Sequence, residues 1–234
     1  MRRRQFLQNA SLPALAAIAS SPRSAAAQTN PDQAQPPAQL TLPKPQIQGG
    51  RPLMEVLRDR KTSRNISDEK FSPQMLSNLL WAAWGVNRPV VRGRTAPSAM
   101  NVQEIELYVF LAEGVYLFDG PAHTLKPLLA GDHRARTGTQ LEVGKAPVSL
   151  VYVADFEKYS GGRPARISDP AVQLAWSNAH AGFIAQNVYL FAASEGLATW
   201  YRALVDARAL RDLLSLEPSK RVLYSQGVGY PAKG

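Results

Sequence analysis

Hydrophobic residues recur at helical spacing in four segments, which we expect to form helices. The first spans residues 52–61, and the second spans 73–84, with Ser72 as its N-cap, a proline at its first position and a glycine as its stop. A long third segment covers residues 169–194, and a short fourth one covers 207–216. The long helix is apolar on so many sides that we expect it to be largely buried. Its large apolar residues are Leu174, Phe183, Ile184, Val188, Leu190 and Phe191.

Short runs of β-branched and aromatic residues predict strands between these helices. Residues 106–111 and 114–119 flank a tight turn and predict a hairpin. Residues 146–155 form a nearly continuous apolar run, which is typical of a central strand buried on both faces. Two further strands are predicted at 199–205 and 222–229. We find no internal repeat, so the pattern predicts one mixed α and β domain in which helices outnumber strands.

The beginning of the chain has a different character from the rest. Residues 1–27 combine an arginine cluster, a modest apolar run and a small-residue cleavage-like site, which indicates an export signal. Arg3 and Arg4 resemble the twin-arginine type of signal, so we expect export to the periplasm by that machinery; a non-specific basic N-terminus is the alternative. Residues 28–50, rich in Gln, Pro and Ala, predict a flexible linker. The folded domain is therefore expected over residues 51–234.

Charge and composition restrict the partners. The 234-residue chain carries a formal charge of +9, but the signal contributes four basic residues and no acidic ones, which leaves 23 basic against 18 acidic residues, or +5. No Lys/Arg run with interleaved aromatic residues stands out, so we expect no nucleic-acid binding. No apolar stretch approaches the roughly 20 residues needed to cross a bilayer, so we expect no stable membrane insertion.

Residue types also exclude several classes of chemistry. The absence of cysteine excludes disulfides, thiolate metal sites, iron–sulfur clusters and cysteine nucleophiles. The histidines are His123, His133 and His180, and their spacing matches neither HxH nor HExxH. We therefore expect no metal site, although a site built from these three isolated histidines is an open alternative.

Four polar segments could bind a ligand, and each also has an ordinary structural explanation. Residues 59–64, DRKTSR, offer guanidinium groups and hydroxyls suited to phosphate, or simply a basic helix end. Residues 94–103, RTAPSAMNVQ, form a stiff polar turn or a helix cap. Residues 194–202, SEGLATWYR, present backbone amides at a strand end, or a helix-ending glycine. Residues 228–233, VGYPAK, place a lysine after a rigid turn, or in a frayed terminus.

The order of these segments resembles the nitroreductase family of FMN-dependent oxidoreductases. The shared pattern is R-x-[ST]-x-[RK] after the first helix, A-P-S-x-x-N-x-Q before the first strand, E-G-[LI] after the long helix, and a closing V-G-Y-P. The resemblance extends from about Arg51 to the C-terminus. Within the family, the chain is most similar to the short branch grouped with the azoline-oxidising dehydrogenases.

The resemblance implies an α+β fold in which helices flank a central, mainly antiparallel sheet. It also implies an intertwined homodimer with FMN bound at the interface, so that part of each site comes from the partner chain. The implied FMN ligands are Arg60, Thr62, Arg64 and Lys233 at the phosphate, Pro97, Ser98 and Asn101 at the flavin and ribityl chain, Glu195 and Gly196 near N5, and Gln140 at the pyrimidine edge.

The implied activity is electron transfer through the flavin to a small acceptor such as a nitroaromatic or a quinone. NAD(P)H is the usual donor in the family, and because the cofactor performs the chemistry we assign no single catalytic acid or base. A flavin dehydrogenase acting on a peptide or small heterocycle is one alternative. The azoline-oxidising enzymes use a Lys-Tyr pair that has no match here, where Trp200, Tyr201 and Arg202 follow the E-G turn. A non-catalytic flavin-binding protein is the other alternative.

Overall fold

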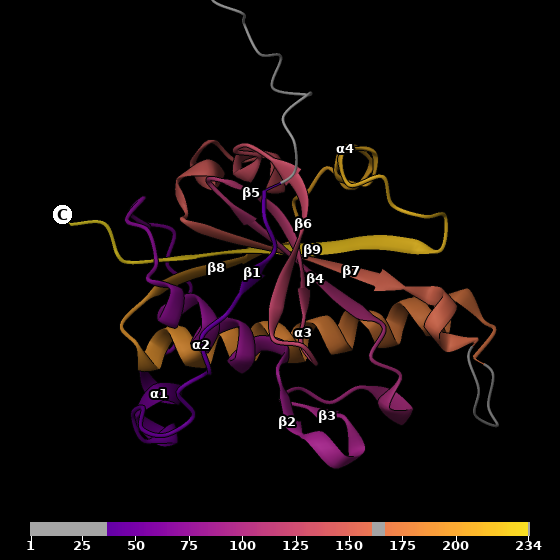
Figure 1. Cartoon of the computed structure of the whole chain (residues 1–234), viewed down its shortest axis with the longest axis horizontal. Helices are drawn as coiled ribbons and strands as arrows, with labels where there is room; N and C mark the ends of the chain where they lie inside the picture. Colours follow the sequence, from indigo (N-terminus) through magenta and orange to yellow (C-terminus); the bar gives the residue numbers. More distant parts are fainter. Residues whose placement is uncertain (1–36, 161–166, 234) are drawn as a thin grey trace, which may run out of the picture.

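The computed structural model describes residues 37–160 and 167–233 and is built on a seven-stranded sheet (Figure 1). The strand order is β1-β6-β5-β4-β7-β9-β8, and every neighbouring pair is antiparallel. The strands are β1 (Leu40–Thr41), β4 (Ile105–Leu111), β5 (Gly114–Asp119), β6 (Thr124–Ala130), β7 (Val148–Asp155), β8 (Ala198–Arg202) and β9 (Lys220–Gly229). The expected mainly antiparallel sheet is confirmed. The predicted export signal lies outside the described residues.

Helices cover both faces of the sheet, as Figure 1 shows. The helices are α1 (Leu53–Asp59), α2 (Pro73–Trp84), α3 (Pro170–Ser194) and α4 (Ala207–Leu213). Alternate residues of β4 supply two cores: Leu107 and Val109 join the core beneath α2 and α3, whereas Tyr108 and Phe110 join a smaller core with Leu210 of α4. None of the described helices is long and apolar enough to cross a bilayer.

Several local predictions are confirmed by the structure. The Ser72 hydroxyl accepts a hydrogen bond from Met75 N, and Gly85 ends α2 with its N–H bonded to Trp81 O. Strand β7 is buried along its whole length up to Ala154 and lies between β4 and β9, as its continuous apolar run predicts. These elements form as predicted because their signals are local in sequence.

The prediction that helices outnumber strands is wrong, since the described residues form nine strands and four α-helices. Two of the missed strands, β2 (Val86–Arg88) and β3 (Gly93–Arg94), form a separate short hairpin. Strand β6 escaped prediction because Lys126 and Pro127 interrupt its apolar pattern. A proline is tolerated there because the outer neighbour of β6 is the two-residue strand β1, which pairs only with Leu125 and Thr124.

Two further predictions need correction. Part of the predicted linker belongs to the domain, because β1 pairs with β6 and Leu42 is buried in the larger core. The folded domain thus begins before residue 51. In addition, α3 is not buried on all sides: Leu174 and Phe183 are 42% and 46% exposed. The helix therefore presents apolar side chains on the surface of the single chain.

Candidate functional site

The basic segment at residues 60–64 lies beside the C-terminal end of the chain. Ala232 N donates a hydrogen bond to Asn65 O at 3.1 Å, and Ile66 forms a bridge with Pro231. This pairing is antiparallel and follows directly from β9, so the exposed Lys233 comes next to the basic segment. The structure therefore brings together two of the predicted phosphate-binding elements that are far apart in sequence.

Tyr189 on α3 connects this segment to the helix and to β8. Its hydroxyl is 2.9 Å from Thr62 Oγ1 and accepts a hydrogen bond from Tyr201 N at 3.1 Å. The Arg60 guanidinium carbon lies 5.3 Å from the centre of the Tyr189 ring, within the range of a cation–π contact. Arg60 and Thr62 are thus positioned by the C-terminal half of α3.

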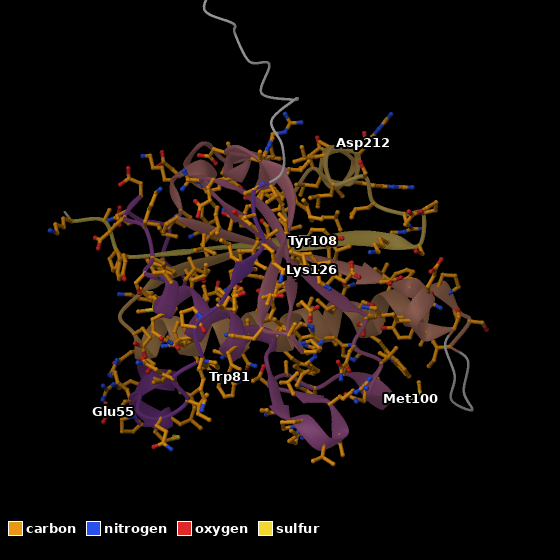
Figure 2. All side chains as sticks on the ribbon, viewed as in Figure 1. Glu55, Trp81, Met100, Tyr108, Lys126 and Asp212 are labelled. Carbon is orange, nitrogen blue, oxygen red and sulfur yellow. The ribbon has the colours of Figure 1, made fainter. Side chains whose placement is uncertain are left out.

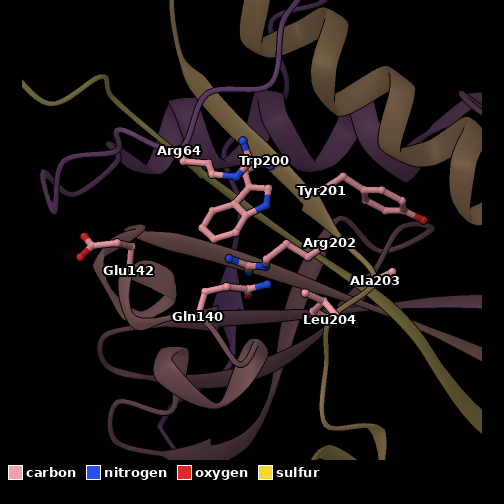
Figure 3. Close-up of a pocket in the computed structure, with 8 residues that line it drawn as sticks. All are labelled: Arg64, Gln140, Glu142, Trp200, Tyr201, Arg202, Ala203 and Leu204. Carbon is pink, nitrogen blue, oxygen red and sulfur yellow. The ribbon is translucent and has the colours of Figure 1, made fainter.

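Trp200 on β8 lies between two guanidinium groups, as Figure 3 shows. The guanidinium carbons of Arg64 and Arg202 are 5.2 Å and 4.7 Å from its ring centre. These side chains line a cavity of about 440 Å³, together with Gln140 and Glu142. The cavity therefore has two stacked cations in its wall.

Arg202 is buried at 3% exposure without a carboxylate partner. Its Nε donates to Ser225 Oγ at 3.0 Å and its Nη2 to Thr137 Oγ1 at 3.4 Å, both neutral acceptors. None of the ion pairs among the described residues involves Arg202. Desolvation lowers the pKa of Arg202 to about 10, so the group stays charged at neutral pH. A buried cation of this kind favours an anionic or electron-rich ligand in the cavity.

Gln140 adds a second unsatisfied group to the same cavity. Its Oε1 is buried and has no hydrogen-bond partner in the described part of the protein. The one carboxylate in the cavity wall belongs to Glu142, which pairs with Lys145 at 2.5 Å. The cavity wall is therefore positive in charge, and Gln140 beside it holds a buried acceptor that no described group satisfies.

The E-G turn after α3 borders a neighbouring cavity of about 300 Å³. Glu195 caps the helix by donating its N–H to Phe191 O at 2.9 Å, and Gly196 follows with φ of +69°. A left-handed residue is needed there to turn the chain from α3 into β8, and glycine adopts it without strain. Ser63 of the basic segment lines this cavity and donates its N–H to Thr199 O at 2.9 Å.

The A-P-S loop, residues 96–103, lies in a different part of the folded structure from the two cavities. Ala99 N donates to His180 Nε2, and His180 is nine residues before Tyr189, which is about 13 Å along a helix that rises ~1.5 Å per residue. Figure 2 shows Met100 of this loop and Glu55 of α1 at opposite ends of the molecule. A single chain therefore does not bring Pro97, Ser98 and Asn101 to the other predicted residues.

The three histidines have separate surroundings. His123 bonds to Ser77 Oγ, His133 to Ala130 O, and His180 to Glu104. Within residues 37–160 and 167–233, no group of three or more His, Asp or Glu side chains could hold a metal ion.

Sequence reasoning assigned no role to Tyr189 or Arg202. The signal for Arg202 was an arginine at the end of an otherwise apolar strand, where a charge is costly unless it serves a purpose. Tyr189 gave no such signal, because an aromatic residue in a long apolar helix is ordinary.

Both the sequence and the fold are similar to those of known proteins. The sequence profile described as the nitroreductase family matches residues 57–230. A protein of Methanocaldococcus jannaschii that carries the name nitroreductase is 29% identical over 189 residues, which are 75% of this chain and 90% of that protein. A crystal structure of a nitroreductase from Ralstonia eutropha JMP134 matches with a TM-score of 0.78 at 38% identity. The match covers 84% of this chain and 90% of the Ralstonia eutropha chain.

A more distant structure shows the shared fold alone. The NADPH:FMN oxidoreductase of Vibrio harveyi, solved in complex with NAD+, has a TM-score of 0.57 at 18% identity, over 77% of this chain and 69% of its own. The extent of the profile match and the Ralstonia eutropha structure show that the chain belongs to the nitroreductase family.

Proposed function

We propose that the protein is an FMN-dependent oxidoreductase that passes electrons through bound flavin to a small acceptor such as a nitroaromatic or a quinone. The observation that carries this proposal is the cavity beside Trp200, where Arg64, a buried unpaired Arg202 and an unsatisfied Gln140 converge. Family membership supports the oxidoreductase class, and the polar, cationic lining fits a ligand with a phosphate and an electron-rich ring edge.

Different residues of the chain would hold different parts of FMN. Arg60, Thr62 and Lys233 would hold the phosphate, because guanidinium, hydroxyl and ammonium groups suit its oxygens. Arg64, which the family resemblance implied at the phosphate, would instead face the polar edge of the ring with Arg202 and Gln140, because it lines the cavity beside Trp200. The E-G turn would face the N5 side of the ring. When bound, FMN supplies the hydride-transfer chemistry, while the protein orients it and excludes water. Positive charge at the cavity wall stabilises added negative charge there.

We also propose that the protein is a homodimer and that the A-P-S loop completes the flavin site of the partner chain. Pro97 and Asn101 are exposed on the single chain, and Met100 is 53% exposed. Leu174 and Phe183 of α3 are exposed apolar side chains on opposite sides of the helix, and each offers a separate apolar contact to a second copy. On its own chain the loop contacts α3 at His180, nine residues before Tyr189, and none of its residues lines the cavity beside Trp200 or the cavity at the E-G turn.

A mixed-dimer experiment tests this arrangement. One chain carries Arg60→Ala with Arg64→Ala, and the other carries Ser98→Ala with Asn101→Ala; each variant alone is expected to lose most of its FMN. After unfolding and refolding the two together, random pairing should restore about one quarter of all sites, since each mixed dimer regains one intact site. FMN bound per chain, measured by absorbance after gel filtration, gives the result.

The matched control mixes wild type with a chain that carries all four substitutions. If the site forms between chains, about one quarter of the sites should remain, whereas a site within one chain would leave about half. No recovery in the first mixture together with half occupancy in the control would contradict the shared site.

A simpler prediction concerns colour and reduction. The chain, purified and incubated with FMN, should bind about one FMN per chain, and NADH or NADPH should bleach it anaerobically, with colour restored by a nitroaromatic or a quinone. Protein that stays colourless after reconstitution would overturn the proposal. Bound flavin that no donor reduces would instead support the non-catalytic alternative.

The reductant and the location stay predictions. Export by a twin-arginine signal rests on residues 1–27, outside the described part, and would place the enzyme where NAD(P)H is scarce. An anaerobic scan of reductants against flavin bleaching identifies the donor. A heterocyclic substrate that bleaches the flavin, with no NAD(P)H turnover, would favour the dehydrogenase alternative.

A further inference from the structure

A buried glutamate and histidine hold the A-P-S loop on α3. Glu104 is fully buried directly after the loop, and His180 is 4% exposed in the middle of α3. His180 Nδ1 lies 2.7 Å from Glu104 Oε1, and His180 Nε2 accepts a hydrogen bond from Ala99 N at 2.9 Å. One imidazole thus connects a buried carboxylate to the main chain of the loop.

The two hydrogen bonds fix the tautomer of the ring. Because Nε2 accepts from the Ala99 amide, it carries no proton, and the ring proton must lie on Nδ1. Nδ1–H then donates to the Glu104 carboxylate, which selects this tautomer. Removing Glu104 would free the ring to place its proton on Nε2, where it would face the Ala99 N–H. Glu104 therefore acts on the loop through His180.

The loop itself is strained and needs to be held. Met100, Asn101 and Gln103 have φ values of 51°, 57° and 52°, in the left-handed region that residues with a side chain seldom adopt. Further hydrogen bonds hold the same turn: Gln103 N donates to Ser98 Oγ at 3.0 Å, and Gln103 Nε2 donates to Asn101 Oδ1 at 2.8 Å. Strain kept by several such contacts is common where a site is preorganised.

The surroundings of Glu104 set it apart from a routine core residue. Its second oxygen, Oε2, is buried and has no hydrogen-bond partner in the described part of the chain. Tyr159 lies nearby and bonds to Ser177 Oγ at 3.0 Å; burial raises the pKa of the Tyr159 hydroxyl, and the Glu104 carboxylate raises it as well. Burying a carboxylate with one oxygen left without a hydrogen bond costs folding free energy, which argues for a role of Glu104 beyond packing.

We propose that Glu104 and His180 are positioning residues that lock the A-P-S loop in the shape that closes the flavin site of the partner chain. This inference rests on the proposed function for the partner's flavin, but the lock itself is a property of the single fold. His180 provides the acceptor for the loop, and Glu104 keeps that acceptor free of a proton. Neither residue lines the cavity beside Trp200 or the cavity at the E-G turn.

The test combines three variants with a wild-type spectrum. His180→Phe removes both bonds and Glu104→Leu removes the tautomer control, whereas Glu104→Gln keeps an oxygen that can accept from Nδ1–H. Amide hydrogen exchange of the peptide covering residues 96–103 should accelerate at least about tenfold in the first two variants and little in Glu104→Gln. The dissociation constant for FMN should rise roughly tenfold in the same two, with rescue in Glu104→Gln.

A matched control and a spectroscopic signature separate the lock from general stability. His123→Phe removes another partly buried histidine bond, to Ser77 at 2.7 Å, and should leave both the exchange of the loop and FMN affinity unchanged. In wild-type protein, long-range proton–nitrogen correlation spectra should show His180 protonated on Nδ1 only.

Each outcome decides a separate question. A proton on Nε2 of wild-type His180, or loop exchange that is unchanged in Glu104→Leu, would overturn the lock even if His180→Phe does not fold. Amide exchange that accelerates equally in the loop and in β7 of these variants would also overturn the lock, because that pattern indicates general destabilisation. If the loop exchange changes as expected while wild-type protein binds no FMN, the lock stands and the proposed function fails.

Discussion

Replacing Arg60 and Arg64 together by alanine is expected to weaken FMN binding by a factor of roughly 10² to 10⁴. A hydrogen bond to a charged group is worth about 1.5–3 kcal/mol, so two such contacts give about 3–6 kcal/mol, and about 1.4 kcal/mol corresponds to a tenfold change. Both arginines contact aromatic rings, Tyr189 and Trp200, at the surface of the chain. Cation–π contacts at exposed sites contribute only about 0.5–1 kcal/mol each, so the variant should fold normally. Fluorescence titration of FMN with the flavin-free protein measures the effect.

The matched control removes two arginines that lie away from the cavities. Arg208 and Arg211 are both exposed on α4 and line neither cavity. The variant Arg208→Ala with Arg211→Ala changes the net charge by the same amount but should alter the dissociation constant by less than about threefold, because exposed charges at a distance are screened by salt. Equal losses in both double variants would mean that net charge, and not the basic segment, governs FMN binding.

The elements whose signals are local could be predicted from the sequence. Ser72 caps α2, and the continuous apolar run becomes the central strand β7, because capping and burial on both faces leave a clear pattern over a few residues. Strand β1 gave no such pattern, since two residues in a Pro-rich stretch pair only through their contact with β6. Its place in the fold depends on a neighbour some 80 residues away.

The candidate site was predicted as a set of segments but not as an arrangement. Order along the chain could indicate that the basic segment and the closing V-G-Y-P belong to one site, and the Asn65–Ala232 bond brings these two together. The same reasoning could not show that the A-P-S loop lies away from Tyr189, because no sequence signal indicates that Ala99 bonds to His180. Nor could it show that Arg202 points inward beneath Trp200.

The burial of Arg202 reflects a compromise between stability and function. An unpaired guanidinium inside a protein loses hydration that two neutral acceptors, Ser225 and Thr137, only partly replace. A hydrophobic residue of similar volume at this position should therefore leave the flavin-free protein at least as stable. The buried charge serves function if it stabilises a bound ligand. It stabilises a flavin most when the flavin is reduced and carries extra electron density.

Arg202→Met is accordingly expected to lower the two-electron reduction potential of bound FMN by roughly 30–60 mV, since 30 mV corresponds to about 1.4 kcal/mol for this couple. Spectroelectrochemical titration of the reconstituted protein measures the potential, and thermal unfolding of the flavin-free protein should show an unchanged or higher Tm. Arg202→Lys keeps the charge and should retain most of the potential, whereas Arg136→Met, an exposed arginine next to Thr137, should leave the potential unchanged. If Arg202→Met lowers Tm and leaves the potential at the wild-type value, Arg202 serves the packing of β8 and not the flavin. A potential that falls equally in Arg202→Lys would assign the effect to the shape of the guanidinium fork instead of its charge.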